Sequence, residues 1–401
     1  MISVCLYFQV HQPKRLRHDY RFFNIGDDPN YENSDLNRGI LRKVANSCYL
    51  PSNAILLELI NKLDGQFKVC FSLSGTFLEQ CENDAPDVLE SFQKLVATGC
   101  VELLNETYYH SLAFHYSKKE FREQVELHRK KIKELFDYEP TAFRNTELIL
   151  DNKVAAEVEK MGYDVVLTEG ANRILGWRTP NFVYQAKESY KLKLLLRNFK
   201  LSDDLSFRFS DVRSPGYPVT AEKYAASIQQ VAGNGEVVNI FMDYETFGEH
   251  QWAESGIHEF LKHLPHEVLK YKNMNFKTPT EIAKNSQPVA KIDMPNPVSW
   301  ADLERDLTAW RGNSMQDSSL ENIYALEKKV MKSKDPELID CWRNLQTSDH
   351  FYYMCTKWFS DGDVHRYFNP YGTPHEAYIV YSNVLNDLIE RVKSLDKEYA
   401  I

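Results

Sequence analysis

Several features of exported, membrane and disulfide-stabilised proteins are missing from this chain of 401 residues. It has no apolar run of about 18 residues or more, so no transmembrane helix and no membrane partner are expected. The first residues, 1–5, have neither a basic segment nor a small-residue cleavage site, which predicts a cytoplasmic protein without a signal peptide. The seven cysteines include no CxxC pair and are odd in number, which predicts free thiols rather than a disulfide framework.

Basic charge and phosphate-binding glycine loops are also missing. The formal net charge is −9, which argues against a nucleic-acid partner because such partners usually need a basic face. No glycine-rich loop follows any predicted strand, which disfavours a nucleotide-binding fold. No HExxH or HxxxH pair accompanies the acidic residues, so neither a metal nor another cofactor is expected. A neutral substrate suits this charge balance, and the oligomeric state is left open.

The sequence does contain repeated strand patterns. In residues 2–10 apolar and polar side chains alternate with period two, and Pro13 ends the run. The apolar face is expected to pack on helices and the polar face to point into a barrel. Six further candidate strands lie at 67–75, 100–110, 141–149, 164–170, 190–198 and 236–245.

Helical stripes separate many of these strands, for example at 85–99 and 118–137. Strands that alternate with helices predict a parallel α/β sheet with crossover helices. Seven strands fit either a barrel or an open doubly wound sheet.

From about residue 290 the pattern becomes helical. Segments 301–310, 319–332 and 336–345 are expected to be helices, and 373–398 opens with the capping-box residues Thr373, Pro374 and Glu376. We therefore expect two domains, an α/β domain over 1–290 and a helical domain over 291–401 that packs directly on the first.

Acidic residues and histidines gather where the predicted strands end. Because ligands bind at the C-terminal ends of barrel strands, several acids are expected to converge on one pocket. The strand-end candidates are His11, Glu102, Glu106, His110, Glu147, Asp243 and Glu245.

Strand alternation predicts the direction of the two acidic strand ends. It places Glu147 on the same face as Phe143 and Asn145, and it places Asp243 on the same face as Glu245. Both faces are the more polar ones, so both acidic ends are expected to point into the pocket.

Paired carboxyls of this kind point to glycoside hydrolysis. One carboxyl acts as nucleophile and another, whose pKa is raised by crowding with other carboxylates so that it stays protonated, acts as acid/base. The residues alone do not choose between Asp243 and Glu245 for the second role. Asp243, Glu245, Glu249 and His250 could instead bind a metal, and each acid could be an ordinary loop or cap residue.

Five stretches, in order along the chain, resemble glycoside hydrolase family 57, the α-amylase-type family. They are HQP (11–13), GCVELLNETYYH (99–110), FRNTELI (143–149), FMDYETFGEHQ (241–251) and QTSDHFYYM (346–354). Segments 194–210 and 299–310 are similar to its intracellular α-amylase-like branch. Asn105 and Arg311 depart from the pattern, since small or apolar residues are expected there.

The resemblance implies an incomplete, seven-stranded parallel (β/α)7 barrel followed by a helical domain. It implies a retaining mechanism on α-glucans or maltooligosaccharides without a required metal. Glu147 matches the nucleophile and Asp243 the acid/base. The residues matched to substrate binding are His11, Glu102, His110, Glu245, Trp300 and Asp349.

Three alternatives stay open. A 4-α-glucanotransferase or branching enzyme would use the same fold and the same two carboxyls. A metal-dependent carbohydrate deacetylase would use a related barrel. A non-catalytic glucan-binding module would bind without turnover.

Overall fold

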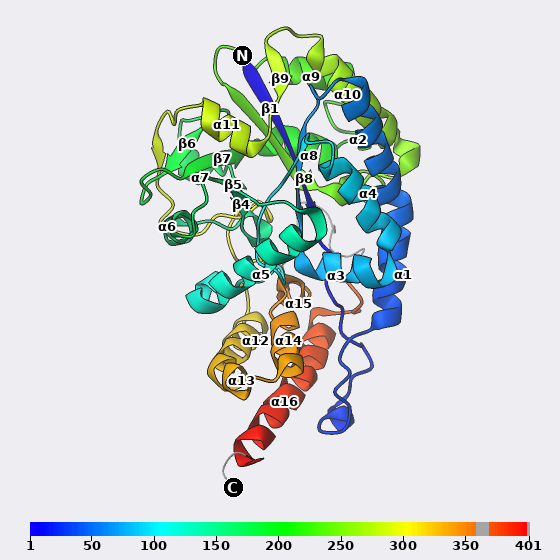
Figure 1. The fold of residues 1–401 in the computed structure, drawn as a ribbon, viewed down its shortest axis with the longest axis vertical. Helices are drawn as coiled ribbons and strands as arrows, with labels where there is room; N and C mark the ends of the chain where they lie inside the picture. The colour runs from blue at the N-terminus through cyan, green and yellow to red at the C-terminus, as the bar shows by residue number, and fades with distance from the viewer. Residues whose placement is uncertain (358–368, 399–401) are drawn as a thin grey trace.

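The computed structural model describes residues 1–357 and 369–398, and its core is a set of parallel strands (Figure 1). All seven predicted strands are present: β1 (Ile2–Val10), β2 (Val69–Leu73), β3 (Val101–Leu103), β4 (Ala142–Arg144), β5 (Val165–Glu169), β7 (Lys193–Arg197) and β8 (Val237–Asp243). Three short strands were not predicted: β6 (Tyr184–Ala186), β9 (Met274–Phe276) and β10 (Lys291–Ile292).

The strands form two sheets that meet at two places. One has the order β3-β2-β1-β8, with β9 also on β1, and the other has the order β10-β6-β7-β5-β4. Only the β6–β7 pair is antiparallel among the described ladders. A bridge between Asn105 and Phe143 joins β3 to β4, and the Asn198 N–H donates to the Asn239 carbonyl, 2.8 Å away, between β7 and β8. The arrangement is the predicted, mostly parallel α/β fold, and it is consistent with an incomplete barrel in which these contacts link the two sheets.

The alternation in β1 has the predicted consequence. Ile2, Val4, Leu6, Phe8 and Val10 are buried in a core shared with the outer helices. The opposite face contributes Cys5 and Tyr7 to a separate cluster that contains side chains of β2, β5, β7 and β8. The inner face thus begins in this cluster, and Gln9, further along the same face, lines the pocket.

Helices cover the outside of the barrel. They are α1 (Ser34–Val44), α2 (Leu50–Lys62), α3 (Gly75–Asp84), α4 (Pro86–Val96), α5 (Lys118–Phe136), α6 (Asn152–Lys160), α7 (Asn172–Leu175), α8 (Phe199–Ser206), α9 (Ala221–Gln229), α10 (Ile257–Leu269) and α11 (Pro279–Asn285). A π-helical turn at Ala45–Tyr49 joins α1 to α2. None of the helices in the described ranges combines the length and the apolar character needed to cross a membrane.

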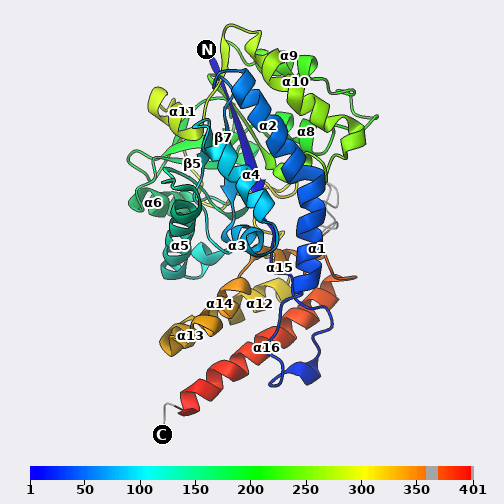
Figure 2. The ribbon, with the colours of Figure 1, turned by 45° about the vertical axis from the view of Figure 1, so that its right-hand side comes forward.

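The C-terminal helices lie below the C-terminal ends of the strands (Figures 1 and 2). They are α12 (Ser314–Ala325), α13 (Glu327–Ser333), α14 (Pro336–Asn344), α15 (Ser348–Tyr352) and α16 (Pro374–Glu398). One hydrophobic cluster contains side chains of α5 and α6 together with side chains of α12, α14 and α16. The helical part thus packs directly on the α/β part, and the division at residue 290 stays a proposal.

Two details of the helical part differ from the sequence prediction. Segment 301–310 is a series of turns, not a helix, because Asp302 and Arg305 adopt left-handed backbone with φ of 54° and 53°. At the start of α16 the Thr373 hydroxyl accepts from the Glu376 N–H at 3.1 Å as predicted, but the Glu376 carboxylate accepts from the Gly372 N–H, at 2.9 Å.

All seven cysteines are free, as expected, and all except the half-buried Cys341 are buried.

The packing of α16 on the helical part makes a stability prediction. Leu388 is 0% exposed, so Leu388→Ala should lower the free energy of unfolding by about 2–5 kcal/mol through lost burial and a cavity. Ile379 on the same helix is 56% exposed, and Ile379→Ala should change it by less than about 0.5 kcal/mol. Urea unfolding of both variants measures the difference, and equal effects would contradict this packing.

Candidate active site

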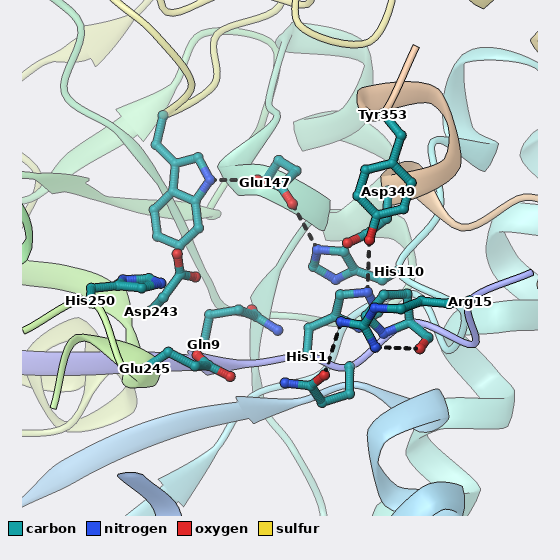
Figure 3. A pocket seen from close by; sticks show the side chains of 13 residues that line it. Gln9, His11, Arg15, His110, Glu147, Asp243, Glu245, His250, Asp349 and Tyr353 are labelled. Atoms are coloured by element: carbon teal, nitrogen blue, oxygen red, sulfur yellow. Dashed lines mark hydrogen bonds and ion pairs between the residues drawn. The ribbon is translucent and has the colours of Figure 1, made fainter. Parts of the chain in front are cut away.

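A pocket opens at the C-terminal ends of the strands, between the barrel and α15 (Figure 3). Strands β1 and β8, the loops after β1, β3, β4 and β8, the loop before α12, and the α15 segment all contribute side chains. The lining residues are Gln9, His11, Gln12, Pro13, Arg15, His110, Glu147, Asp243, Glu245, His250, Trp300, Asp349 and Tyr353.

Glu147 is presented by an unusual backbone. Strand β4 ends at Arg144, and Glu147 lies in the following 3-10 turn with φ 57° and ψ 28°. A left-handed non-glycine residue costs roughly 1–3 kcal/mol and persists only where its surroundings hold it. Strand alternation therefore does not apply to Glu147, which lies beyond the end of β4, although its side chain does line the pocket.

Both carboxylate oxygens of Glu147 accept a hydrogen bond. His110 Nε2 lies 3.0 Å from Oε1, and Trp300 Nε1 donates to Oε2 at 2.6 Å. Figure 3 shows Glu147 pointing toward His110 in the centre of the pocket. Donors on both oxygens stabilise the charged carboxylate and fix its orientation.

His110 in turn lies between two carboxylates. Its Nδ1 lies 2.8 Å from Glu106 Oε2, opposite the contact to Glu147. Burial alone would lower the pKa of His110, but the hydrogen bonds to Glu106 and Glu147 outweigh burial and raise it to about 9. The ring is thus an imidazolium at neutral pH and donates from both nitrogens. The same hydrogen bond, together with the nearby Arg144 charge, outweighs burial and holds the pKa of Glu106 far below its usual range.

His11 stacks on His110 with ring centroids 4.1 Å apart. Burial and the positive charge of His110 lower the pKa of His11, so this second ring is neutral. Its Nε2 lies 2.9 Å from Asp349 Oδ2 and its Nδ1 lies 2.7 Å from Ser74 Oγ. Because Asp349 accepts at Nε2, Nδ1 is the ring nitrogen that accepts from the serine hydroxyl. Asp349 belongs to α15, so the helical part completes the pocket.

Asp243 is the last residue of β8, opposite Gln9 of β1, and is half-buried. Burial and the negative charge of Glu147 raise its pKa to about 7, despite the opposing charges of Arg144, His110 and Arg197. Glu245 follows in a 3-10 turn, where the Tyr49 hydroxyl donates to it, and burial and Asp243 raise its pKa to about 8. On this side of the pocket the raised pKa values therefore favour the protonated form of both carboxyl groups.

The remaining acid of the 241–251 stretch points elsewhere. Glu249 is buried against α1, where Lys43 Nζ lies 2.9 Å away and the Ser47 hydroxyl donates at 2.5 Å. Asp243, Glu245, Glu249 and His250 thus do not converge on one point, and the described residues hold no group of three or more His, Cys, Asp or Glu side chains placed to bind a metal ion. His250 lines the pocket.

One predicted pocket residue is misplaced. Glu102 lies within β3, level with Cys70 of β2, and its carboxylate accepts from the Thr280 N–H at 3.0 Å and from the Thr280 hydroxyl. Glu102 does not line the pocket. Glu106, four residues further on and beyond the end of β3, contacts His110 instead. The other predicted residues, namely His11, His110, Glu147, Asp243, Glu245, Trp300 and Asp349, do line it together.

The sequence interpretation did not select Gln9, Gln12, Arg15 or Tyr353, which also line the pocket. Gln9 could have been found, because it lies on the polar face of β1, and its amide donates to Glu106 Oε1 at 3.2 Å. Tyr353 lies within the quoted 346–354 stretch.

The two departures from the family pattern lie outside the pocket. Asn105 is buried at the β3–β4 junction, where its amide donates to the Val125 carbonyl at 3.1 Å. Arg311 pairs with Asp317 at 2.9 Å.

Comparison with solved structures supports the fold. A 4-α-glucanotransferase from Thermococcus litoralis matches with TM-score 0.70 and 16% identity, covering 96% of this chain and 59% of that chain. A branching enzyme from Thermococcus kodakaraensis matches with TM-score 0.64 and 13% identity, covering 88% of this chain and 85% of that chain. An α-amylase from Thermotoga maritima matches with TM-score 0.61 and 13% identity, covering 98% of this chain and 93% of that chain. At these identities the likeness shows the fold, and this chain spans less than two thirds of the glucanotransferase.

Sequence comparison finds a relative with higher identity than these solved structures. A curated protein of Methanocaldococcus jannaschii, whose name marks it provisionally as an α-amylase, is 43% identical over 97% of this chain and 84% of its own length. The family model described as Glycosyl hydrolase family 57 matches residues 5–295. On both grounds the chain belongs to glycosyl hydrolase family 57.

Proposed function

We propose that the protein is a retaining glycoside hydrolase that cleaves α-1,4 bonds of α-glucans or maltooligosaccharides. The observation that carries the proposal is the pair of acids in one pocket, Glu147 and Asp243, whose surroundings act on them in opposite ways. Glu147 receives a donor at each oxygen, whereas Asp243 has its pKa raised to about 7. A charged nucleophile beside a protonated acid is what a retaining glycosidase requires.

The chemistry assigns a role to each group. A Glu147 oxygen attacks the anomeric carbon while Asp243 gives its proton to the leaving glycosidic oxygen, which forms a glycosyl ester on Glu147. Asp243, now ionised, takes a proton from water as that water attacks the same carbon and releases Glu147. Two displacements at one carbon retain its configuration.

The neighbouring residues suit sugar binding. Neutral His11, the Asp349 carboxylate and Gln9, the strand neighbour of Asp243, line the same pocket and offer polar groups to sugar hydroxyls. The α-glucan class rests on the family and on the α-amylase name of the 43% identical relative. The cytoplasmic location stays a prediction.

Product analysis with maltoheptaose tests the reaction. Shorter maltooligosaccharides and new reducing ends are expected. Longer products with few new reducing ends would replace the hydrolase by a 4-α-glucanotransferase or branching enzyme on the same residues. Binding without turnover would favour a glucan-binding module. Turnover of acetylated glycans that a chelator abolishes would favour a deacetylase.

The nucleophile assignment predicts the behaviour of two matched variants. Glu147→Gln should lower kcat on the order of 10⁴-fold or more, because the amide cannot form the ester. Glu102→Gln, which changes a buried acid outside the pocket, should keep kcat within about threefold, as expected for a group that does not contact the reacting atoms. Initial rates with maltoheptaose compare them, and equal losses would contradict the assignment.

The acid assignment predicts the basic limb of the pH profile. Asp243 must be protonated to act, and its raised pKa of about 7 means that kcat/KM should fall as pH rises through about 7.

In Glu147→Gln the negative charge beside Asp243 is gone, so the pKa of Asp243 should be lower than in the wild type. Carbon-13 NMR of the Asp243 carboxyl measures this directly, and an unchanged or higher pKa would contradict the proposed coupling.

A further inference from the structure

Arg144, the last residue of β4, is fully buried inside the barrel and does not line the pocket. None of its three guanidinium nitrogens has a hydrogen-bond partner in the part of the chain that the structure describes. Burying a charge without hydrogen bonds is costly, and replacing such a group by an apolar one often leaves a protein as stable or more stable. Fold stability therefore does not explain this side chain.

Two contacts of Arg144 are informative. Its Nη1 lies 3.7 Å from Glu106 Oε2, and its guanidinium carbon lies 5.1 Å from the centroid of the Trp300 ring, within cation–π range. Glu106 binds His110, which binds Glu147 Oε1, whereas Trp300 binds Glu147 Oε2 directly. We call Glu106 and His110 the His110 arm, which holds Oε1 of Glu147, and Trp300 the Trp300 arm, which holds Oε2. The Arg144 guanidinium contacts both arms.

Arg197, a second buried arginine, makes a useful contrast. Its guanidinium carbon lies 5.9 Å from the same Trp300 ring, but its nitrogens bind Glu169 at 3.2 Å, Asp203 at 2.5 Å and the Phe241 carbonyl at 2.8 Å. Arg197 is therefore anchored to β5, α8 and β8. Arg144 has no such anchor and depends on Glu106 and Trp300.

We propose that Arg144 is a positioning residue that holds the His110 arm and the Trp300 arm together, so that both oxygens of Glu147 stay aligned for attack. The inference rests on the proposed role of Glu147 as nucleophile. Glu147 has left-handed backbone, which persists only where surrounding contacts hold it. The direction of its carboxylate therefore depends on the contacts that its two oxygens make.

The charge of Arg144 supplies a readout that a merely structural residue would not. The charged groups with the strongest effects on the pKa of Asp243 are Glu147, Arg144, His110 and Arg197, and Glu245 is coupled to it as well. Among them Arg144 opposes the rise in the pKa of Asp243. Removing Arg144 should raise the pKa of Asp243 further and move the basic limb of kcat/KM to higher pH.

The test compares Arg144→Met, Arg144→Lys and Arg343→Met. Arg144→Met should lower kcat about 100-fold, since small misplacements of a reacting group have effects of that size, while KM changes little and thermal stability is kept. Arg144→Lys keeps the charge without the planar guanidinium, so it should restore the basic limb and only part of kcat.

Arg343 is the matched control, because it is also buried but pairs with Glu120 at 2.8 Å and Glu123 at 2.7 Å outside the pocket. Arg343→Met should lose stability and keep kcat. A wild-type kcat in Arg144→Met, or a loss of kcat that merely follows loss of folded protein, would overturn the proposal.

A second readout is independent of turnover. The indole N–H signal of Trp300 in nitrogen-15 NMR, assigned with Trp300→Phe, reports its hydrogen bond to Glu147. In Arg144→Met it should move toward the position of a free indole, and in Arg343→Met it should not. An unchanged signal in Arg144→Met would overturn the positioning role. Failure of the wild type to cleave maltoheptaose would instead overturn the proposed function.

Discussion

His110 lies between two carboxylates, with Nδ1 2.8 Å from Glu106 and Nε2 3.0 Å from Glu147. Both nitrogens donate only when the ring is protonated, and the paired carboxylates raise its pKa to about 9. A neutral ring would leave one of the two carboxylates without its donor. Because Glu147 has left-handed backbone, its direction depends on such side-chain contacts. The imidazolium therefore connects the loop after β3 to the loop after β4 and aims the carboxylate of the second loop.

The pocket separates charged from protonated acids although they lie close together. On one side His110, Trp300 and Arg144 surround Glu106 and Glu147 with donors and positive charge. On the other side burial and the charge of Glu147 favour the protonated form of Asp243. The three acids of the stretch 241–251 point in different directions. Asp243 and Glu245 line the pocket, where Glu245 also accepts from the Tyr49 hydroxyl, whereas Glu249 pairs with Lys43 outside it. Charge repulsion is thus relieved partly by protonation and partly by separation.

Much of the barrel could be predicted from periodicity. The alternation in β1 gave the correct inner and outer faces. The strands β6, β9 and β10 have two or three residues and no longer alternating run around them, whereas the equally short β3 and β4 lie within longer predicted segments. Alternation also failed to separate Glu102 from Glu106. Both have the same parity, but Glu102 lies within β3 whereas Glu106 lies in the loop after it, where it contacts the pocket residue His110.

Other features depend on contacts between distant segments. Arg144 lies in the quoted 143–149 stretch, but no role for it followed from the sequence, because that role depends on Trp300 from a loop far along the chain. The left-handed turn at Glu147 has no glycine to mark it. Segment 301–310 has a helix-like pattern, yet Asp302 and Arg305 adopt left-handed backbone, and Arg305 is held by the Trp300 carbonyl and by Asp203. In each case tertiary contacts override the local preference.

The proposed roles of Glu147 and Asp243 are nucleophile and acid/base in two successive displacements at one carbon. These roles can be tested by proton NMR of the anomers formed in the first minutes of maltoheptaose cleavage, before mutarotation. Two displacements should leave the new reducing ends in the α configuration of the bond that was cut. Release of the β anomer would show a single displacement by water and would contradict the assignment of Glu147 as nucleophile.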